Sequence, residues 1–124
     1  MKKEEKQNRR KEEKINTIIG KGTYIEGSIN IKHSCRIDGT VKGKITSGEN
    51  IIVGEGGFID GTIVSDRVVV SGKVLGQIYA SSSAMFSEKA EFDGDLKTMK
   101  ILIADGAIFN GKCEMIKKSE LKNN

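Results

Sequence analysis

The stretch Ile37-Asp38-Gly39-Thr40-Val41-Lys42-Gly43-Lys44-Ile45 is the part of this sequence that most clearly indicates its fold. Apolar or glycine residues alternate with polar ones along its whole length. In an extended strand, successive side chains point to opposite faces of a sheet, so the apolar residues and glycines would share one face. The alternation therefore predicts a β-strand with one buried side.

The motif apolar–polar–Gly–polar–apolar that opens this stretch recurs along the chain, and six copies mark the repeat. Asp-Gly between apolar residues is also typical of two-residue hairpin turns, in which the flanking residues pair on one face. A hairpin would place Ile37 beside Thr40 and Phe92 beside Asp95, which mixes apolar and polar side chains on that face. A continuous strand separates them, so we predict a strand for every copy. The copies are Ile25–Ile29, Ile37–Val41, Ile59–Ile63, Val70–Val74, Phe92–Leu96 and Phe109–Cys113.

A longer repeat connects these copies. Shifting Ile37–Ile63 by 33 residues aligns seven identical residues, among them Gly39 with Gly72 and Gly61 with Gly94. The 33-residue unit divides into two parts of about 15 and 18 residues, and each part suits one coil of a solenoid. We therefore expect an all-β fold, a triangular parallel β-helix of about six coils, in which glycines turn corners and fill the narrow core.

Charge is concentrated at the two ends of the chain. Of the net charge of +4, residues 1–14 contribute +3 and residues 117–124 contribute +2, whereas residues 15–116 carry −1. Short charged segments without an apolar pattern are typical of disorder. We therefore expect a disordered N-terminal arm over residues 1–16, a folded β-helix over residues 17–116 and a disordered tail over residues 117–124. The neutral body argues against nucleic acid as a partner, since such a surface needs an excess of Lys and Arg.

The composition excludes most catalytic and metal-binding chemistry. One His, His33, and two Cys, Cys35 and Cys113, cannot build a His-rich zinc site, a four-thiolate site or a disulfide framework. We expect His33 at an exposed corner and both Cys in the core. The glycine-rich Val53–Gly57 lacks the Lys-Ser/Thr of a P-loop, and no apolar run is long enough to span a membrane. The expectation is a cytoplasmic protein without enzymatic activity, metal or cofactor.

The two ends of a solenoid expose unpaired backbone groups and the cross-section of the apolar core. Natural solenoids usually cover these ends with polar caps, whereas this chain has no Pro and no amphipathic segment beside its end coils. Because apolar residues occupy both end coils, we expect the ends to stack on other copies of the chain. The candidate contact residues are Ile101, Ile103, Ile108 and Phe109 at one end and Ile18, Ile19, Tyr24 and Ile25 at the other.

The region Tyr24–Lys112 resembles the bactofilins. The resemblance rests on the repeated Ile-Asp-Gly-Thr-Val/Ile motifs, on Val41–Ile45 and on the closing Gly106–Gly111, and it extends over about residues 17–116. It implies a right-handed β-helix that polymerises end to end, without nucleotide, into filaments that lack polarity and act as a bacterial cytoskeletal scaffold. It also implies that Phe109 corresponds to the phenylalanine at the subunit contact of the family.

The resemblance implies partners and a location as well. Members of the family position cell-wall enzymes at the cytoplasmic face of the membrane and influence cell shape. Cell-wall enzymes or membrane proteins, reached through the tails, are therefore expected partners beside the chain itself. Many members begin with a short apolar membrane-targeting segment, whereas this chain begins Met1-Lys2-Lys3-Glu4-Glu5. We expect weak or no direct binding to the membrane.

Two other functions remain open on the sequence. A hexapeptide-like β-helical transferase would also stack Ile and Val, but it would need a catalytic His or three zinc-binding His and a strict six-residue period. A monomeric ligand-binding solenoid would need a flat face of repeated Thr or aromatic residues, whereas the polar positions here mix Asp, Lys, Ser and Thr. A trimer with activity or bound metal would support the transferase, and filaments would support the scaffold.

Overall fold

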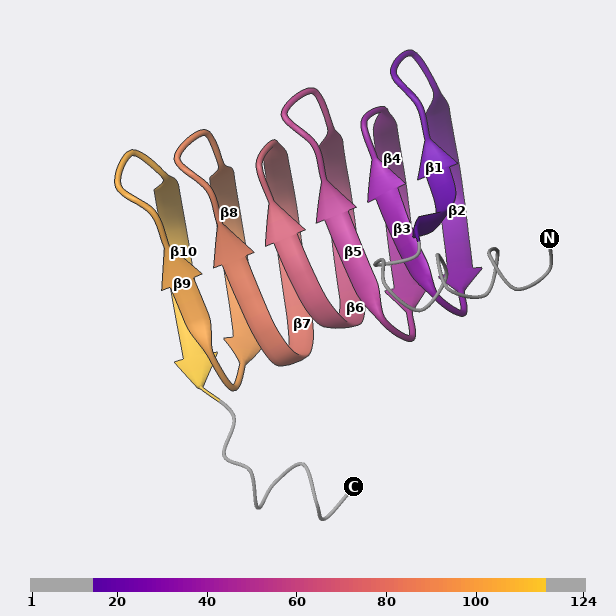
Figure 1. Ribbon diagram of the computed structural model, residues 1–124. Helices are drawn as coiled ribbons and strands as arrows, with labels where there is room; N and C mark the ends of the chain where they lie inside the picture. The colour runs from indigo at the N-terminus through magenta and orange to yellow at the C-terminus, as the bar shows by residue number, and fades with distance from the viewer. Residues whose placement is uncertain (1–14, 116–124) are drawn as a thin grey trace, which may run out of the picture.

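The computed structural model describes residues 15–115, and the expected disordered segments lie outside this range except at residues 15 and 16. All regular structure in the described range is β-strand, and every strand pairs in parallel with its neighbours. Figure 1 shows the strands stacked as successive turns of a solenoid. The strands are β1 (Ile15–Ile19), β2 (Tyr24–Ile31), β3 (Ser34–Ile37), β4 (Thr40–Ser47), β5 (Asn50–Val53), β6 (Phe58–Val70), β7 (Lys73–Phe86), β8 (Glu91–Thr98), β9 (Ile101–Ile103) and β10 (Ile108–Met115).

Each turn of the solenoid contributes a short rung and a long rung to the stack. The short rungs are β1, β3, β5, the second halves of β6 and β7, and β9. The long rungs are β2, β4, the first halves of β6 and β7, β8 and β10. Both ladders have six rungs, so the chain forms a parallel β-solenoid of about six turns, as predicted. We number the turns 1 to 6, from β1 and β2 to β9 and β10.

The core consists of inward-facing residues that stack in columns along the axis. In the long rungs, Ile59 lies between Val41 and Val74 of the neighbouring turns, and all three side chains are buried. Burial of such a side chain stabilises the fold by roughly 1.5–3 kcal/mol relative to an exposed one. The short rungs add an equivalent buried column of Ile37, Val53, Val70 and Phe86.

One glycine per turn forms a further column in the long rungs. The φ angles of these six glycines lie between +122° and +151°, a region that L side chains rarely adopt. A Cβ atom at Gly61 would also collide with the carbonyl oxygen of Gly43 in the preceding turn. Each long rung nevertheless continues as one strand through its glycine, so a turn contains one short and one long strand segment. The column is Gly27, Gly43, Gly61, Gly76, Gly94 and Gly111.

The structure corrects the prediction that every copy of the motif is one continuous strand. Four copies lie within β2, β6, β8 and β10. Ile37–Val41 instead spans a corner, because β3 ends and β4 begins within it, and Val70–Val74 spans a corner between β6 and β7 in the same way. In these two turns the strand motif is Val41–Ile45 and Val74–Ile78, whose glycines complete the column. A two-residue corner preserves the period of two, so alternation alone does not reveal it.

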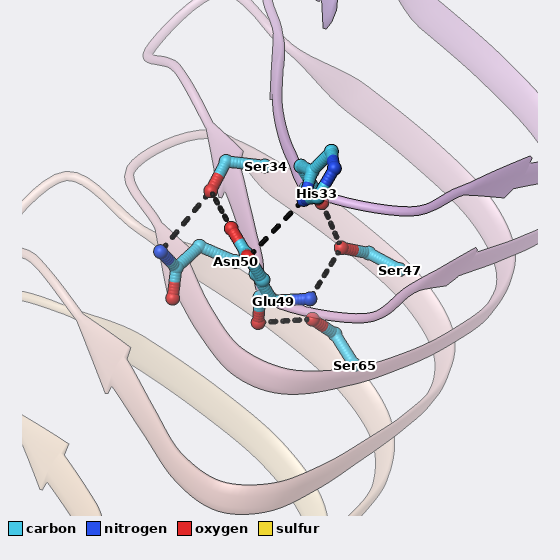
Figure 2. A network of polar contacts seen from close by, with 6 residues as sticks. All are labelled: His33, Ser34, Ser47, Glu49, Asn50 and Ser65. Carbon is cyan, nitrogen blue, oxygen red and sulfur yellow. Dashed lines mark hydrogen bonds and ion pairs between the residues drawn. The ribbon is translucent and has the colours of Figure 1, made fainter. Parts of the chain in front are cut away.

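A different corner is closed by buried hydroxyl groups, which Figure 2 shows. Ser47 Oγ donates to the carbonyl oxygen of His33 at 2.6 Å and accepts from the backbone N–H of Glu49 at 3.1 Å. Ser65 Oγ lies 2.9 Å from the carbonyl oxygen of Glu49 and 3.1 Å from that of Arg67. Each hydroxyl thus adds a hydrogen bond to backbone groups at the corner, beside the bond from the Arg67 N–H to the Glu49 carbonyl, and it ties neighbouring turns together.

Replacing Ser65 with Ala is expected to lower the free energy of unfolding by about 1 kcal/mol, because it removes the one hydroxyl proton shared between the carbonyls of Glu49 and Arg67, while the Glu49 carbonyl keeps its bond from the Arg67 N–H. Ala fits this position sterically, since Ala80 follows Ser65 in the same column. Denaturant unfolding monitored by circular dichroism, at matched protein concentration, measures the change. The control Ser28→Ala removes an exposed hydroxyl and should alter stability by less than about 0.5 kcal/mol. Equal effects of the two substitutions would contradict the role of Ser65.

The positions of His33 and Cys35 agree with the sequence prediction, and the position of Cys113 does not. His33 is exposed at a corner, with Nδ1 3.2 Å from a carboxylate oxygen of Glu49. Cys35 is buried in the core, and burial raises the pKa of its thiol to about 11. The prediction of a core position is wrong for Cys113, which is exposed. It continues the inward column after Leu96, but it belongs to the last turn of the described chain, so nothing in that range covers it.

Candidate functional site: the two ends of the solenoid

Turn 6 exposes the apolar core at the C-terminal end of the solenoid. Phe109 packs against Phe92 and Phe86, with ring centroids 5.1 Å and 5.7 Å away. Ile101 also packs against the core and is half-buried. Ile103 is 46% exposed, whereas Phe86, which precedes it in the same column, is 1% exposed. The inward columns thus continue into turn 6 but lose the cover that the next turn provides elsewhere.

Turn 1 exposes the core at the opposite end. Ile25 packs against the core but is only half-buried, whereas Val41, its partner in turn 2, is fully buried. Ile29 and Ile31 are half-buried in the same way. These two were not among the predicted contact residues, although the period of two along Ile25–Ile31 points to them. Ile19 is buried at 7% exposure and begins the column that continues through the short rungs.

Three of the predicted contact residues face sideways rather than along the axis. Ile18, Tyr24 and Ile108 are exposed and alternate with inward-facing neighbours. The Tyr24 hydroxyl donates to a carboxylate oxygen of Glu26 at 3.0 Å, and Lys42 Nζ lies 5.8 Å from the centroid of the Tyr24 ring. These residues form the rim of each end, next to the exposed core residues. At the C-terminal end, Ala107 and Met115 add apolar surface that was not predicted.

Both ends also present the edge of a parallel sheet. Within residues 15–115, β1 pairs only with β3 and β2 only with β4, whereas β9 pairs only with β7 and β10 only with β8. Each edge therefore carries backbone N–H and C=O groups that can pair with another strand. An apolar cross-section bordered by free backbone groups is suited to strand addition by a second copy of the solenoid.

The acidic, His and Cys side chains of the described residues are spread over the solenoid. Within residues 15–115, no group of three or more His, Cys, Asp or Glu side chains is arranged to hold a metal ion. Asp60 and Asp93 share an outward column, but Leu75 lies between them, so they form no stacked pair of carboxylates. The part of the chain seen in the structure also contains no helix that is long and apolar enough to cross a membrane.

Comparison with known proteins relates the chain to one family. A family model described as "Bactofilin: Polymer-forming cytoskeletal" matches residues 17–114. Over 100 residues the chain is 39% identical to bactofilin BacO of Myxococcus xanthus (strain DK1622). This alignment covers 81% of this chain and 79% of BacO. The chain is 29% identical over 100 residues to bactofilin BacP of the same organism. That alignment covers 81% of this chain but only 42% of BacP.

A solved structure shows the same architecture. The chain is similar to a crystal structure of a bactofilin from Thermus thermophilus that carries a phenylalanine-to-arginine mutation. The TM-score is 0.67 at 28% sequence identity, and the match covers 70% of this chain and 97% of that chain. The bactofilin-type β-solenoid expected from the sequence is thereby confirmed. The chain belongs to the bactofilin family, which is described as polymer-forming and cytoskeletal.

Proposed function

We propose that this protein is a structural, non-catalytic subunit that assembles end to end, without nucleotide, into cytoskeletal filaments. The observation that carries the proposal is the change in exposure along one core column, from 1% at Phe86 in turn 5 to 46% at Ile103 in turn 6. Stacking on another copy would remove this apolar surface from water, which is favourable by about 25 cal/mol per Å². Because each bound copy leaves a further end exposed, the assembly has no inherent stop.

The proposed contact combines core residues in the cross-section with apolar residues at the rim. The core residues supply the area to be buried, and the rim residues extend it sideways. At the C-terminal end we assign the cross-section to Ile101, Ile103 and Phe109 and the rim to Ile108. At the N-terminal end we assign the cross-section to Ile25, Ile29 and Ile31 and the rim to Ile18 and Tyr24, whereas Ile19 is already buried and adds little area.

We further propose that the filaments scaffold cell-envelope or cell-shape machinery in the bacterial cytoplasm, with cell-wall enzymes or membrane proteins as partners. The cytoskeletal description of the family supports this role. The sequence supports it as well, since residues 1–14 and 117–124 carry charged stretches outside the solenoid repeat that could contact other proteins. A hexapeptide-like transferase fits less well, because the chain has a single His and that residue lies at an exposed corner.

Ultracentrifugation of the purified wild-type protein tests the assembly. We expect most of the protein in the pellet in buffer that contains EDTA and no nucleotide, because the contact is apolar and uses no ligand. Addition of ATP or Mg²⁺ should leave the pelleted fraction unchanged. Protein that stays in the supernatant at every concentration would contradict the proposal, and so would pelleting that depends on ATP.

A further inference from the structure

The short rungs carry an apolar stripe on their outward side. Strand register places one outward side chain per turn in a single column, and five of the six are large and apolar. Ile18, Met85 and Leu102 are 65%, 44% and 49% exposed, and Ile52 and Val69 are half-buried. With a rise of about 4.8 Å per turn, the stripe is about 24 Å long. The apolar stripe consists of Ile18, Arg36, Ile52, Val69, Met85 and Leu102, one from each turn in order.

The apolar stripe differs from the outward columns of the long rungs. Charged and polar residues dominate there, as expected of a solvated face. The fold itself does not require the stripe, because the inward columns form the core. Apart from Arg36 the column is apolar, and an apolar column on the outside of the solenoid is a surface that a second molecule can cover. The long-rung column used for comparison is Glu26, Lys42, Asp60, Leu75, Asp93 and Asn110.

The corners beside the apolar stripe alternate in length over turns 1 to 5, and turn 6 has a four-residue corner, residues 104–107, like that of turn 5. Turns 1, 3 and 5 connect their short and long rungs through the four-residue corners Gly20–Thr23, Gly54–Gly57 and Ser87–Ala90. Turns 2 and 4 use the two-residue corners Asp38–Gly39 and Ser71–Gly72. Figure 1 shows the longer corners rising above the shorter ones along the upper edge of the solenoid. The edge beside the stripe is therefore a row of projections and gaps.

A hollow lies over the short corner of turn 2. Its volume is about 490 Å³, and its lining includes Arg36 and Ile52 of the apolar stripe. Lys21 and Glu55 line it from the longer corners on either side. Arg36 contacts Asp38 within the hollow, with its Nε 3.0 Å from a carboxylate oxygen. The hollow is thus continuous with the stripe and can receive a projecting corner.

We propose that this face pairs with the same face of a second copy that runs antiparallel, so that neighbouring filaments associate side by side. The proposal rests on the end-to-end assembly proposed above. A two-fold axis between turns 3 and 4 sets turn 3 opposite turn 4 and turn 2 opposite turn 5. Ile52 then lies opposite Val69 of the second copy, and Arg36 lies opposite Met85 rather than opposite another Arg36.

Over turns 2 to 5 the same axis also sets four-residue corners opposite two-residue ones, whereas the four-residue corners of turns 1 and 6 face each other. The corner of turn 3 faces the shorter corner of turn 4, and Ser87–Ala90 of turn 5 faces the hollow over turn 2. That corner exposes Glu88 and Lys89, and the hollow is lined by Lys21 and Glu55, so each side offers one charge of each sign that can pair with the other. A parallel pairing in register, related by a two-fold axis along the solenoid, would place the corners of the two copies on opposite sides and would bring two Arg36 side chains together. The antiparallel arrangement is therefore favoured.

The area of the apolar stripe explains why filaments, rather than single subunits, would pair. A strip about 24 Å long and about 10 Å wide covers on the order of 250 Å² per copy. Stable complexes bury about 800 Å² per partner, so one stripe is too small to hold an isolated dimer. In a filament the contact recurs at every subunit, and the contributions accumulate. Side-by-side pairing is thus expected only after the ends have stacked.

Two opposite charges at one position test the antiparallel arrangement. Met85→Lys places like charge opposite Arg36 and is expected to convert paired wild-type filaments into single ones of about half the width in electron micrographs. Met85→Glu places opposite charge there and should keep the pairing. Leu75→Lys is the matched control on a long rung and should also keep it. Equal widths for wild-type and Met85→Lys filaments would overturn the proposal, and so would unpaired Met85→Glu filaments.

Cross-linking provides a second readout that does not depend on filament width. Ile52→Cys and Val69→Cys proteins, each also carrying Cys113→Ser, are mixed before assembly and oxidised. Disulfides should join the two different variants at least tenfold more than two copies of either one, while buried Cys35 stays unreacted. Same-variant dimers alone, or no cross-link in intact filaments, would overturn the pairing. Absence of filaments in the wild type would instead overturn the proposed function.

Discussion

Replacing Phe109 with Arg is expected to convert the filaments into small oligomers while the β-solenoid stays folded. The new guanidinium would stand in the cross-section of the end, where stacking would have to remove it from water without a partner. An uncompensated buried charge costs several kcal/mol, which corresponds to a rise in critical concentration of roughly 100-fold or more. The contacts with Phe86 and Phe92 are lost as well, but they belong to the end of the core and not to its centre.

Light scattering after size exclusion measures the oligomers, and circular dichroism verifies the fold. Asn110→Arg is the matched control, because it adds the same charge at the exposed neighbouring position of β10 and should polymerise like the wild type. Ile103→Lys changes a second residue of the same cross-section and should act like Phe109→Arg. Normal filaments from both the Phe109 and the Ile103 variants would show that the C-terminal end is not the contact.

Replacing Gly61 with Ala is expected to prevent the solenoid from folding at ordinary temperature. Gly61 has φ +151°, and its new Cβ would collide with the carbonyl oxygen of Gly43. The obstacle is backbone, so no side chain can move aside, and the two turns would have to separate and lose hydrogen bonds of the long rungs. Strain of about 1–3 kcal/mol and broken hydrogen bonds of about 1 kcal/mol each sum to a loss of more than about 4 kcal/mol.

Thermal unfolding followed by circular dichroism checks this prediction. Gly56→Ala is the control, since a Cβ there meets only the carbonyl oxygen of Asp38 at 3.7 Å, an ordinary contact. Its midpoint of unfolding should stay within about 2 °C of the wild type, whereas Gly61→Ala should show no cooperative β-sheet transition. Similar midpoints for the two variants would contradict the role of the glycine column.

The solenoid itself was predictable because an apolar residue, a glycine and a second apolar residue, each two positions apart, recur in every turn and carry their own alternation. The corners were harder to recognise. Asp38–Gly39 looks like the middle of a strand, because a corner of two residues leaves the period of two unbroken. The buried role of Ser65 was also hidden, since its partners become visible only when the register between turns is known.

The candidate site was predictable in part, because some of its residues belong to the repeated motifs. Phe109 and Ile25 occupy inward positions of recognisable motifs, and the structure places them at the exposed ends of core columns. Ile18–Ile19 and Ile101–Ile103 are unbroken apolar runs without alternation, so the sequence could not separate inward from outward side chains there. The apolar stripe could not be predicted from the sequence. Its members are about 16 to 18 residues apart and align only through the register between the turns.

Negative-stain electron microscopy of the purified wild-type protein, in EDTA and without nucleotide, tests the central claim most directly. Exposed core columns and free sheet edges at both ends predict long, straight, unbranched filaments. A uniform population of compact particles at every protein concentration would contradict the claim, because it would show that the ends of the solenoid do not stack.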